Sequence, residues 1–175
     1  MAGRPRGGVP RSVIRPLEPA DAEPLATIYR TNREFLRPFE PTRPEEFYTA
    51  EFQRWRIEQA GDDHWRWAIQ DGGRIAGVIT LADVIRESLQ LANVGYFVAP
   101  EFNGRGLATR AVTDVVRFAF GDAGLHRLEA GTLPDNRASQ RVLEKNGFTR
   151  YGLARGLLKI DGVWRDHVLF ELLNE

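Results

Sequence analysis

The chain has 175 residues, of which 42% are hydrophobic and 27% are charged, and these proportions are typical of one globular domain. Lys and Arg together number 24, as do Asp and Glu, and no apolar run reaches membrane length, so we expect neither direct nucleic-acid binding nor a membrane partner. Cysteine is absent, which excludes disulfides and thiol nucleophiles and fits a cytoplasmic location. The three histidines lie far apart in sequence, so we expect no metal site.

The N-terminal segment 1–11 differs in composition from the rest of the chain. It is rich in Gly, Pro and Arg and contains no acidic residue. Such a composition predicts a flexible basic tail, because it offers little apolar surface to bury. The alternative is a basic arm that contacts RNA. Residues 12–175 contain no interdomain linker and no internal repeat, so we interpret them as a single domain.

The secondary structure of residues 12–175 is predicted from hydrophobic periodicity and turn residues. The first half of the domain contains a strand at 12–15, a helix at 18–30, an extended or turned proline-containing segment at 31–44, a helix at 45–59 and a hairpin of strands at 65–69 and 74–84. The second half contains a strand at 89–98, a helix at 108–119, a strand at 126–131, a helix at 134–146 and a hairpin of strands at 148–160 and 163–172. Hairpins require antiparallel pairs, whereas a helical crossover permits a parallel pair. The order therefore predicts an α/β (α+β) fold in which helices pack on a mixed sheet.

A glycine-containing loop at 103–108 joins the strand at 89–98 to the next helix. A helix that begins at a glycine turn directs unpaired backbone N–H groups toward whatever precedes it, and the helix dipole adds to their attraction for an anion. The loop lacks the Gly-Lys-Ser/Thr ending of a Walker A motif, and Thr109 stands where a dinucleotide fingerprint requires a third glycine. The loop therefore predicts another kind of phosphate site, the alternative being a plain strand-to-helix turn.

Two segments resemble those of the GNAT N-acetyltransferases. The loop Asn103-Gly104-Arg105-Gly106-Leu107-Ala108 is similar to their Gln/Arg-x-x-Gly-x-Gly/Ala pyrophosphate loop, although Asn103 departs from the usual first residue. The segment from Asn136 to Phe148 resembles their N-x-x-S-x-x-V/L-x-E-K-x-G-F sequence, and the order of elements matches their fold. The resemblance implies a GNAT acyl-CoA N-acyltransferase fold, with a mixed, mostly antiparallel sheet flanked by helices, and acetyl-CoA as the coenzyme.

Two further segments are similar to the RimJ/RimL-type branch of this family. Residues 32–41 resemble its N-R-x-x-L-x-P-W/F-E-P loop, and residues 161–167 resemble its D-G-x-W-R-D-H segment. The closest form of this branch is the ribosomal-protein-alanine N-acetyltransferase. The resemblance therefore implies that the acceptor is the N-terminal α-amine of a protein, with a ribosomal protein as the candidate, and it leaves a homodimer open. The alternatives are acetylation of a small-molecule amine, such as an antibiotic or a polyamine, and a non-catalytic acetyl-CoA-binding module.

The resemblance also implies which residues form the site. The expected coenzyme-binding residues are Phe97, Val98, Asn103, Gly104, Arg105, Gly106, Leu107, Ala108, Thr109, Asn136 and Ser139. The expected acceptor-binding residues are Arg33, Phe39, Glu40, Trp164 and His167. The implied reaction is direct attack of the amine without a covalent enzyme intermediate, and Ser139 is the expected donor to the departing coenzyme thiolate. The alternative role for Ser139 is that of a serine in the first helical turn that only helps to cap the helix.

Asn93 is the second residue expected to take part in catalysis. It stands in the strand where many relatives carry a carboxylate, and its amide cannot accept a proton. An α-ammonium has a pKa near ~7.8 against ~10.4 for lysine, which lowers the work of deprotonation by roughly 3.5 kcal/mol. We therefore expect an α-amine acceptor, which loses its proton to a water chain that Asn93 or Glu40 orients.

Overall fold

The computed structural model describes residues 12–61 and 63–175, so the predicted basic tail at 1–11 lies outside the described residues. The helices are α1 (Ala22–Thr31), α2 (Arg33–Leu36), α3 (Ala50–Glu58), α4 (Leu107–Phe120) and α5 (Arg137–Lys145). The strands are β1 (Ile14–Pro16), β2 (Trp65–Asp71), β3 (Arg74–Ile85), β4 (Leu91–Val98), β5 (Arg127–Thr132), β6 (Thr149–Ile160) and β7 (Val163–Leu173). Short 3-10 turns occupy Pro19–Asp21, Glu45–Tyr48 and Pro100–Phe102. None of the helices described is both long and apolar enough to cross a membrane.

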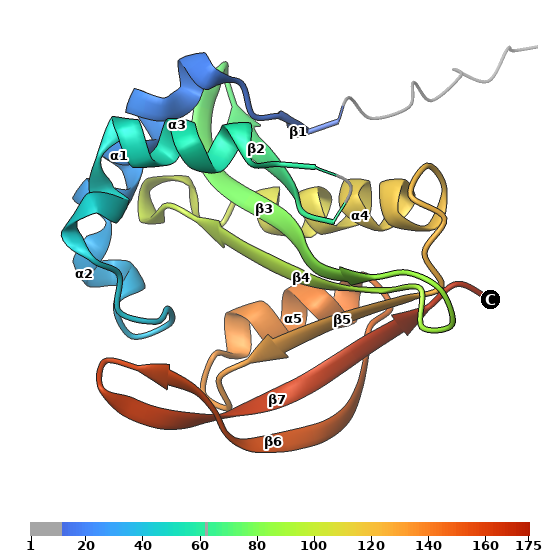
Figure 1. The fold of residues 1–175 in the computed structure, drawn as a ribbon. Coiled ribbons are helices and arrows are strands. Elements are labelled where there is room, and N and C mark those ends of the chain that lie inside the picture. The colour runs from blue at the N-terminus through green and yellow to red at the C-terminus, as the bar shows by residue number, and fades with distance from the viewer. Residues whose placement is uncertain (1–11, 62) are drawn as a thin grey trace, which may run out of the picture.

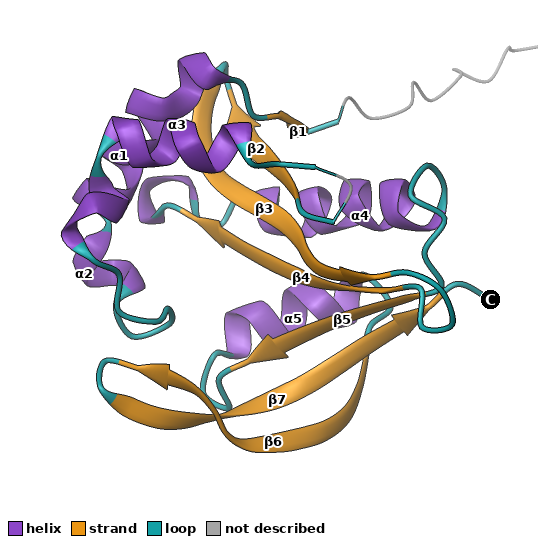
Figure 2. Ribbon diagram, in the orientation of Figure 1, coloured by secondary structure: helices purple, strands orange, loops and turns teal. Residues whose placement is uncertain are grey.

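The described strands form a seven-stranded sheet in the order β1-β2-β3-β4-β5-β7-β6 (Figure 1). Neighbouring strands are antiparallel except β4 and β5, so the mixed, mostly antiparallel sheet expected from the resemblance is confirmed. Helices cover both faces (Figure 2). On one face Tyr29 of α1 contacts Phe97 of β4, with ring centroids 5.0 Å apart. On the other face Trp67 of β2 contacts Phe118 of α4 at 5.1 Å.

The burial pattern of α4 explains how this helix is oriented. Its buried residues recur at intervals of three to four and are Leu107, Ala111, Val112, Val115 and Ala119. Residues at this spacing share one side of a helix, and burying that side against the sheet removes its apolar surface from water. Because the packing sets the direction of the helix axis, it also decides where the helix N-terminus points.

The sheet opens in its middle, between β4 and β5. These two strands pair only from Leu91 with Arg127 to Asn93 with Glu129, although β4 continues to Val98 and β5 to Thr132. Figure 1 shows the two strands diverging beyond that point, with α5 alongside β5. Separated strands leave backbone N–H and C=O groups without ladder partners. The opening is therefore the place in the sheet where a ligand can meet free backbone groups.

Two predicted elements differ from the structure. The helix predicted at 45–59 is interrupted, because Thr49 has extended backbone angles and its hydroxyl caps α3 by accepting from the Phe52 N–H at 3.2 Å. The segment predicted as extended or turned at 31–44 contains the short helix α2, in which the Arg37 N–H donates to the Arg33 carbonyl at 2.9 Å. The first proline of this segment is Pro38, so nothing upstream of it prevents one helical turn.

Candidate active site

A cavity of about 730 Å³ lies in the opening between β4 and β5. Most of the expected coenzyme-binding residues line it, namely Phe97, Val98, Asn103, Gly104, Gly106, Leu107, Ala108, Thr109, Asn136 and Ser139. Three of the expected acceptor-binding residues, Phe39, Glu40 and His167, also line it. The structure thus brings together residues as far apart in the chain as Phe39 and His167.

The N-terminus of α4 forms one wall of the cavity. Gly106 is the N-cap of this helix, in the left-handed conformation with φ of 71°, and Gly104 has φ of 78°. A Cβ atom built on either glycine would meet no atom within 4 Å, so open space lies beside the backbone. Among the residues that the structure describes, no side chain caps α4, and its first turn carries no acidic residue. Free N–H groups, open space and the helix dipole together fit a pyrophosphate.

Arg105 does not take the place expected for it. Its side chain points out of the loop, forms an ion pair with Asp71 and lies over the ring of Phe102 at 5.5 Å. It is not among the residues that line the cavity. The loop therefore offers backbone N–H groups to an anion, while the Arg105 charge is held by Asp71.

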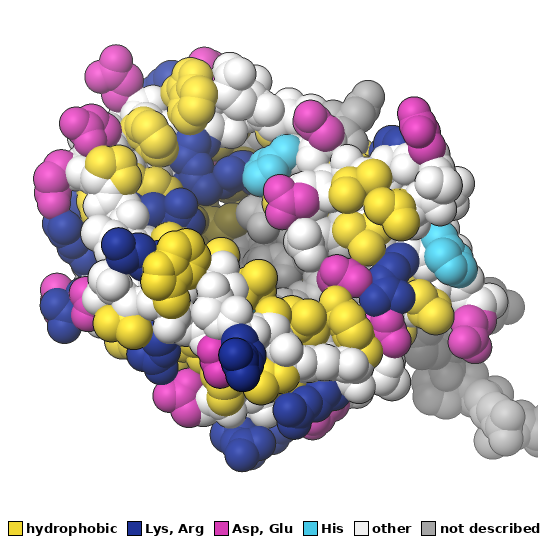
Figure 3. Space-filling view, turned by 60° about the horizontal axis from the view of Figure 1, so that its bottom comes forward, with side chains coloured by type: hydrophobic (Ala, Val, Ile, Leu, Met, Phe, Trp, Pro, Cys, Tyr) yellow, Lys and Arg dark blue, Asp and Glu magenta, His cyan; other side chains and the backbone are white. Residues whose placement is uncertain are grey.

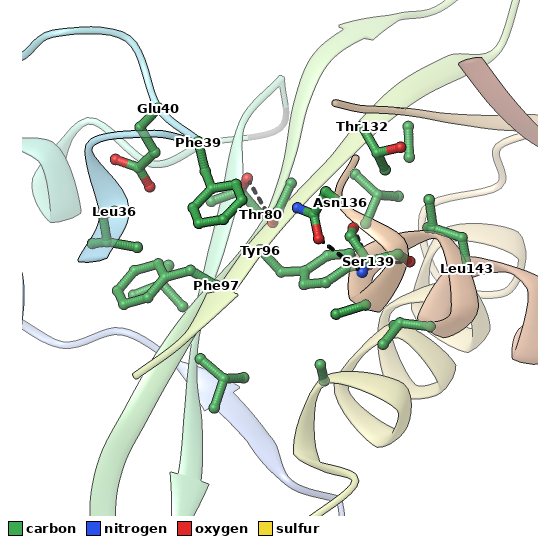
Figure 4. Close-up of a pocket in the computed structure, with 18 of the residues that line it drawn as sticks. Leu36, Phe39, Glu40, Thr80, Tyr96, Phe97, Thr132, Asn136, Ser139 and Leu143 are labelled. Carbon is green, nitrogen blue, oxygen red and sulfur yellow. Dashed lines mark hydrogen bonds between the residues drawn. The ribbon is translucent and has the colours of Figure 1, made fainter. Parts of the chain in front are cut away.

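Two hydroxyl groups meet at the centre of the cavity. The Ser139 Oγ and Tyr96 OH atoms are 2.9 Å apart, and the Tyr96 hydroxyl also lies 3.2 Å from the Ser139 carbonyl oxygen (Figure 4). Burial raises the pKa of Tyr96 to about 12, although its hydrogen bond with Ser139 opposes the rise. Tyr96 therefore stays protonated near neutral pH and can donate a hydrogen bond.

The contacts at the start of α5 separate the two roles considered for Ser139. The N-cap of α5 is Asn136, whose Oδ1 accepts from the Ser139 backbone N–H at 3.1 Å. Capping therefore uses the side chain of Asn136 and the backbone of Ser139. The Ser139 hydroxyl is left for its hydrogen bond with Tyr96.

Glu40 and Phe39 lie on the opposite side of β4 from α5 (Figure 4). Glu40 is partly buried, and burial raises the pKa of its carboxyl group, while the neighbouring Arg43 and Arg56 oppose the rise. His167 of β7 is buried, with its Nδ1 atom 3.2 Å from the backbone oxygen of Arg165. A partly desolvated carboxylate is suited to hold an ammonium group.

Besides Arg105, three of the predicted site residues lie outside the cavity. Asn93 is the last β4 residue paired with β5, and its Nδ2 donates to Asp83 Oδ2 at 3.1 Å. Arg33 forms two hydrogen bonds with Glu45, at 2.7 and 3.1 Å, on the surface. Trp164 is 64% exposed, near the tip of the β6–β7 hairpin. Asn93 thus lies outside the cavity with its amide nitrogen bonded to Asp83, and its orienting role stays a prediction.

Several polar residues of the cavity were not predicted as site residues, and Tyr96 and Thr132 are two of them. Tyr96 lies within the strand predicted at 89–98, and Thr132 ends β5 with its Oγ1 atom buried and without a hydrogen-bond partner among the described residues. Polar side chains at the ends of two strands that stop near one helix were the available signal. That signal became specific only when the strands were seen to separate at this point.

Comparison with known proteins adds to the geometry. Residues 11–149 match the family described as acetyltransferase (GNAT) domain. The chain is 42% identical over 168 residues to a probable N-acetyltransferase, YjcK of Bacillus subtilis (strain 168), across 92% of this chain and 93% of that protein. It is 33% identical over 169 residues to the ribosomal protein uS5-alanine N-acetyltransferase of Escherichia coli (strain K12), across 93% and 87%. The structure of Mycobacterium smegmatis RimJ in complex with CoA-disulfide superposes with a TM-score of 0.86 at 28% identity, across 91% and 80% of the chains.

Proposed function

The chain belongs to the GNAT acetyltransferase family and is an acetyl-CoA-dependent N-acetyltransferase, and we propose that its acceptor is the N-terminal α-amine of a protein, with alanine as the favoured first residue. The observation that carries the proposal is a cavity with a phosphate cradle at α4 and the partly buried carboxylate of Glu40 toward the acceptor side. A relative that is 33% identical acts on the alanine of a ribosomal protein, which supports a ribosomal protein as the acceptor.

The absence of a carboxylate at Asn93 supports an α-amine over a lysine. The strand offers no base at this position, and within the part of the chain that the structure describes, the only carboxylate lining the cavity is that of Glu40. An α-ammonium loses its proton with roughly 3.5 kcal/mol less work than a lysine ammonium. Deprotonation near neutral pH therefore needs only an orienting carboxylate and water, and Glu40 can supply the former.

Each part of the cavity then has a defined task. Acetyl-CoA, when bound, supplies the thioester that carries the acetyl group. The N–H groups of the first turn of α4, from Gly106 to Thr109, hold the pyrophosphate. Glu40 attracts and orients the acceptor ammonium, and the Ser139 and Tyr96 hydroxyls donate to the sulfur that departs. No metal is assigned a role in this proposal.

The acceptor is tested with a series of peptides at fixed pH. We expect acetylation of a peptide that begins with Ala, followed by those that begin with Ser or Met. An N-terminally blocked peptide with an internal lysine should react little, and so should spermidine. Mass spectrometry of the products gives both the rate and the modified atom. Comparable rates on the blocked lysine peptide or on spermidine would refute the α-amine and leave the acetyltransferase assignment standing.

Replacing Glu40 tests the acceptor side of the cavity. We expect Glu40→Gln to lower kcat/KM for the alanine peptide by about ten- to a hundredfold, as for the loss of one hydrogen bond to a charged group, with acetyl-CoA affinity unchanged. Burial raises the pKa of Glu40. At a pH below this pKa, protonation removes both the charge of the Glu40 carboxylate and the unprotonated amine of the acceptor. As the pH decreases below the pKa of Glu40, the logarithm of kcat/KM should fall with a slope against pH that approaches two in the wild type. In the variant the slope should be one.

Glu34→Gln is the matched control for this experiment. Glu34 lies on the same segment as Glu40, pairs with Arg37 on the surface at 3.7 Å and does not line the cavity. It should leave the pH profile as in the wild type. A Glu40→Gln variant with an unchanged profile would show that the carboxylate does not face the acceptor.

A further inference from the structure

Three arginines converge beside the acceptor half of the cavity. Arg43 precedes the 3-10 turn Glu45–Tyr48, Arg56 lies on α3 and Arg66 lies on β2, yet all three line the main cavity. They also line an adjoining cavity of about 360 Å³, which opens beside the first. Figure 3 shows basic side chains gathered within a hollow on this face, next to a histidine. Three separate elements thus direct positive charge into one place.

The three arginines have few partners in the protein. Among the described residues, none of them forms an ion pair, and the Nε atoms of Arg43 and Arg66 are buried without a hydrogen-bond partner. Glu40 is the only carboxylate among the described residues that line the two cavities. The site therefore holds three guanidinium groups against one carboxylate.

The arrangement is held in place before any ligand arrives. The guanidinium carbons of Arg43 and Arg56 lie 5.0 and 4.8 Å from the centroid of the Phe47 ring. Arg56 also donates to Gln53 Oε1 at 3.2 Å, and Gln53 is itself buried. Burial and the charge of Arg56 lower the pKa of Arg66 to about 10, so it remains charged near neutral pH. Cations that repel each other and keep buried donors unused are a costly way to build a core.

We propose that Arg43, Arg56 and Arg66 bind an anionic group, a carboxylate or a phosphate, carried by the acceptor near its reactive amine. The guanidinium fork matches the planar oxygens of either group and can bind both in a bidentate manner. Glu40 lies in the same cavity, so an acceptor with an ammonium and an oxyanion finds a partner for each. The inference rests on the proposed function, and it commits to an acidic side chain close to the N-terminus of the acceptor peptide.

Neutralising the carboxylate of Glu40 does not by itself explain why three arginines converge here. One guanidinium suffices to neutralise one carboxylate, and burial still raises the pKa of Glu40 in the presence of Arg43 and Arg56. Arg66 has no described ion-pair partner, and it faces the same cavities. The excess positive charge is thus directed at something that enters from outside.

The test compares alanine-started peptides in matched pairs. Each pair carries Glu or Gln at the second, third or fourth position, and a further pair carries phosphoserine or serine. We expect wild-type kcat/KM to favour the acidic member by about tenfold at one position, as for one hydrogen bond between charged groups. A greater preference for Glu or for phosphoserine identifies the source of the oxyanion. Equal rates within every pair would overturn the anion site.

Variants of the cluster separate recognition from structure. The preference ratio is the kcat/KM of the acidic peptide divided by that of its neutral partner. In Arg66→Gln and Arg56→Gln this ratio should decrease toward one, whereas Arg66→Lys should retain part of the preference. Arg54→Gln is the matched control, because Arg54 is an exposed residue of α3 outside both cavities. A merely structural role would lower the rates on both members of a pair and leave their ratio unchanged, and this outcome would sink the proposal.

A second readout needs no acceptor. The side-chain Nε–H signals of Arg43 and Arg66 should shift in NMR spectra when inorganic phosphate is added to the coenzyme A complex, in which the α4 loop is already occupied. Unchanged signals would contradict the anion site. Shifted signals without acetylation of any peptide would support the anion site while refuting the α-amine acceptor. Acetylation of peptides with no preference for the acidic member, together with unchanged NMR signals, would support the α-amine acceptor while refuting the anion site.

Discussion

Gly106→Glu is expected to abolish acetyl-CoA binding while the protein stays folded. Gly106 has φ of 71°, a conformation that costs an L-residue roughly 1–2 kcal/mol, which a domain of this size tolerates. The new carboxylate would also sit at the uncapped N-terminus of α4, where the helix dipole favours a negative charge. The same position is the proposed pyrophosphate site, so the new carboxylate would occupy it and repel the phosphates of the coenzyme. We expect calorimetry to detect a loss of affinity of more than about a hundredfold, equivalent to over roughly 2.7 kcal/mol.

Gly124→Glu is the matched control for the loop. Gly124 also has a positive φ, of 61°, and a Cβ there would likewise meet no atom within 4 Å. It lies beyond the C-terminal end of α4, away from the cavity. Both variants should lose a similar amount of thermal stability, but only Gly106→Glu should lose the coenzyme. Unchanged affinity in a folded Gly106→Glu protein would remove the basis for the phosphate cradle.

Ser139→Ala is expected to slow turnover by about 10²–10³-fold while acetyl-CoA affinity stays near normal, the range typical of losing one preorganised hydrogen-bond donor. The variant keeps the backbone N–H that Asn136 accepts from, so the cap of α5 survives. Tyr96→Phe should have a comparable effect, because the two hydroxyls form one hydrogen-bonded pair. The double variant should be little slower than either single variant, as residues that act as a unit are not additive.

The pKa of Tyr96 defines how this pair acts. At about 12, it lies roughly 3.5 pKa units above that of an ordinary thiol, so full proton transfer from Tyr96 to a thiolate would cost about 5 kcal/mol. We therefore expect the pair to stabilise the departing sulfur mainly by donating a hydrogen bond, with solvent supplying the proton. Tyr151→Phe, which removes a hydroxyl outside the cavity, is the control. A decrease in turnover of less than about threefold in Ser139→Ala would assign the serine a structural role.

The features that could be predicted from the sequence are local ones. Alternation along β4, the glycines at 104 and 106 and the helical spacing of α4 are each visible within one stretch of chain. The N-cap of α5 at Asn136 was also predictable, because an Asx cap bonds to an N–H only three residues away. Where local signals compete, the prediction was wrong: Thr49 interrupts the helix predicted at 45–59, since its capping bond and extended backbone outweigh the periodicity on either side.

The site itself was decided by contacts between distant residues. Tyr96 and Ser139 are 43 positions apart, and they meet because β4 separates from β5 just where α5 begins to pack. Arg105 was expected to bind phosphate, but Asp71 lies within reach across the β2–β3 turn and holds it. Arg43, Arg56 and Arg66 come from three different parts of the chain, and they converge through tertiary packing, in which Arg43 and Arg56 both lie over the ring of Phe47; no short segment encodes this arrangement. Sequence alone therefore determined most of the elements and the glycine loop at 103–108, whereas strand register and helix packing, which are non-local, determined which side chains enter the cavity.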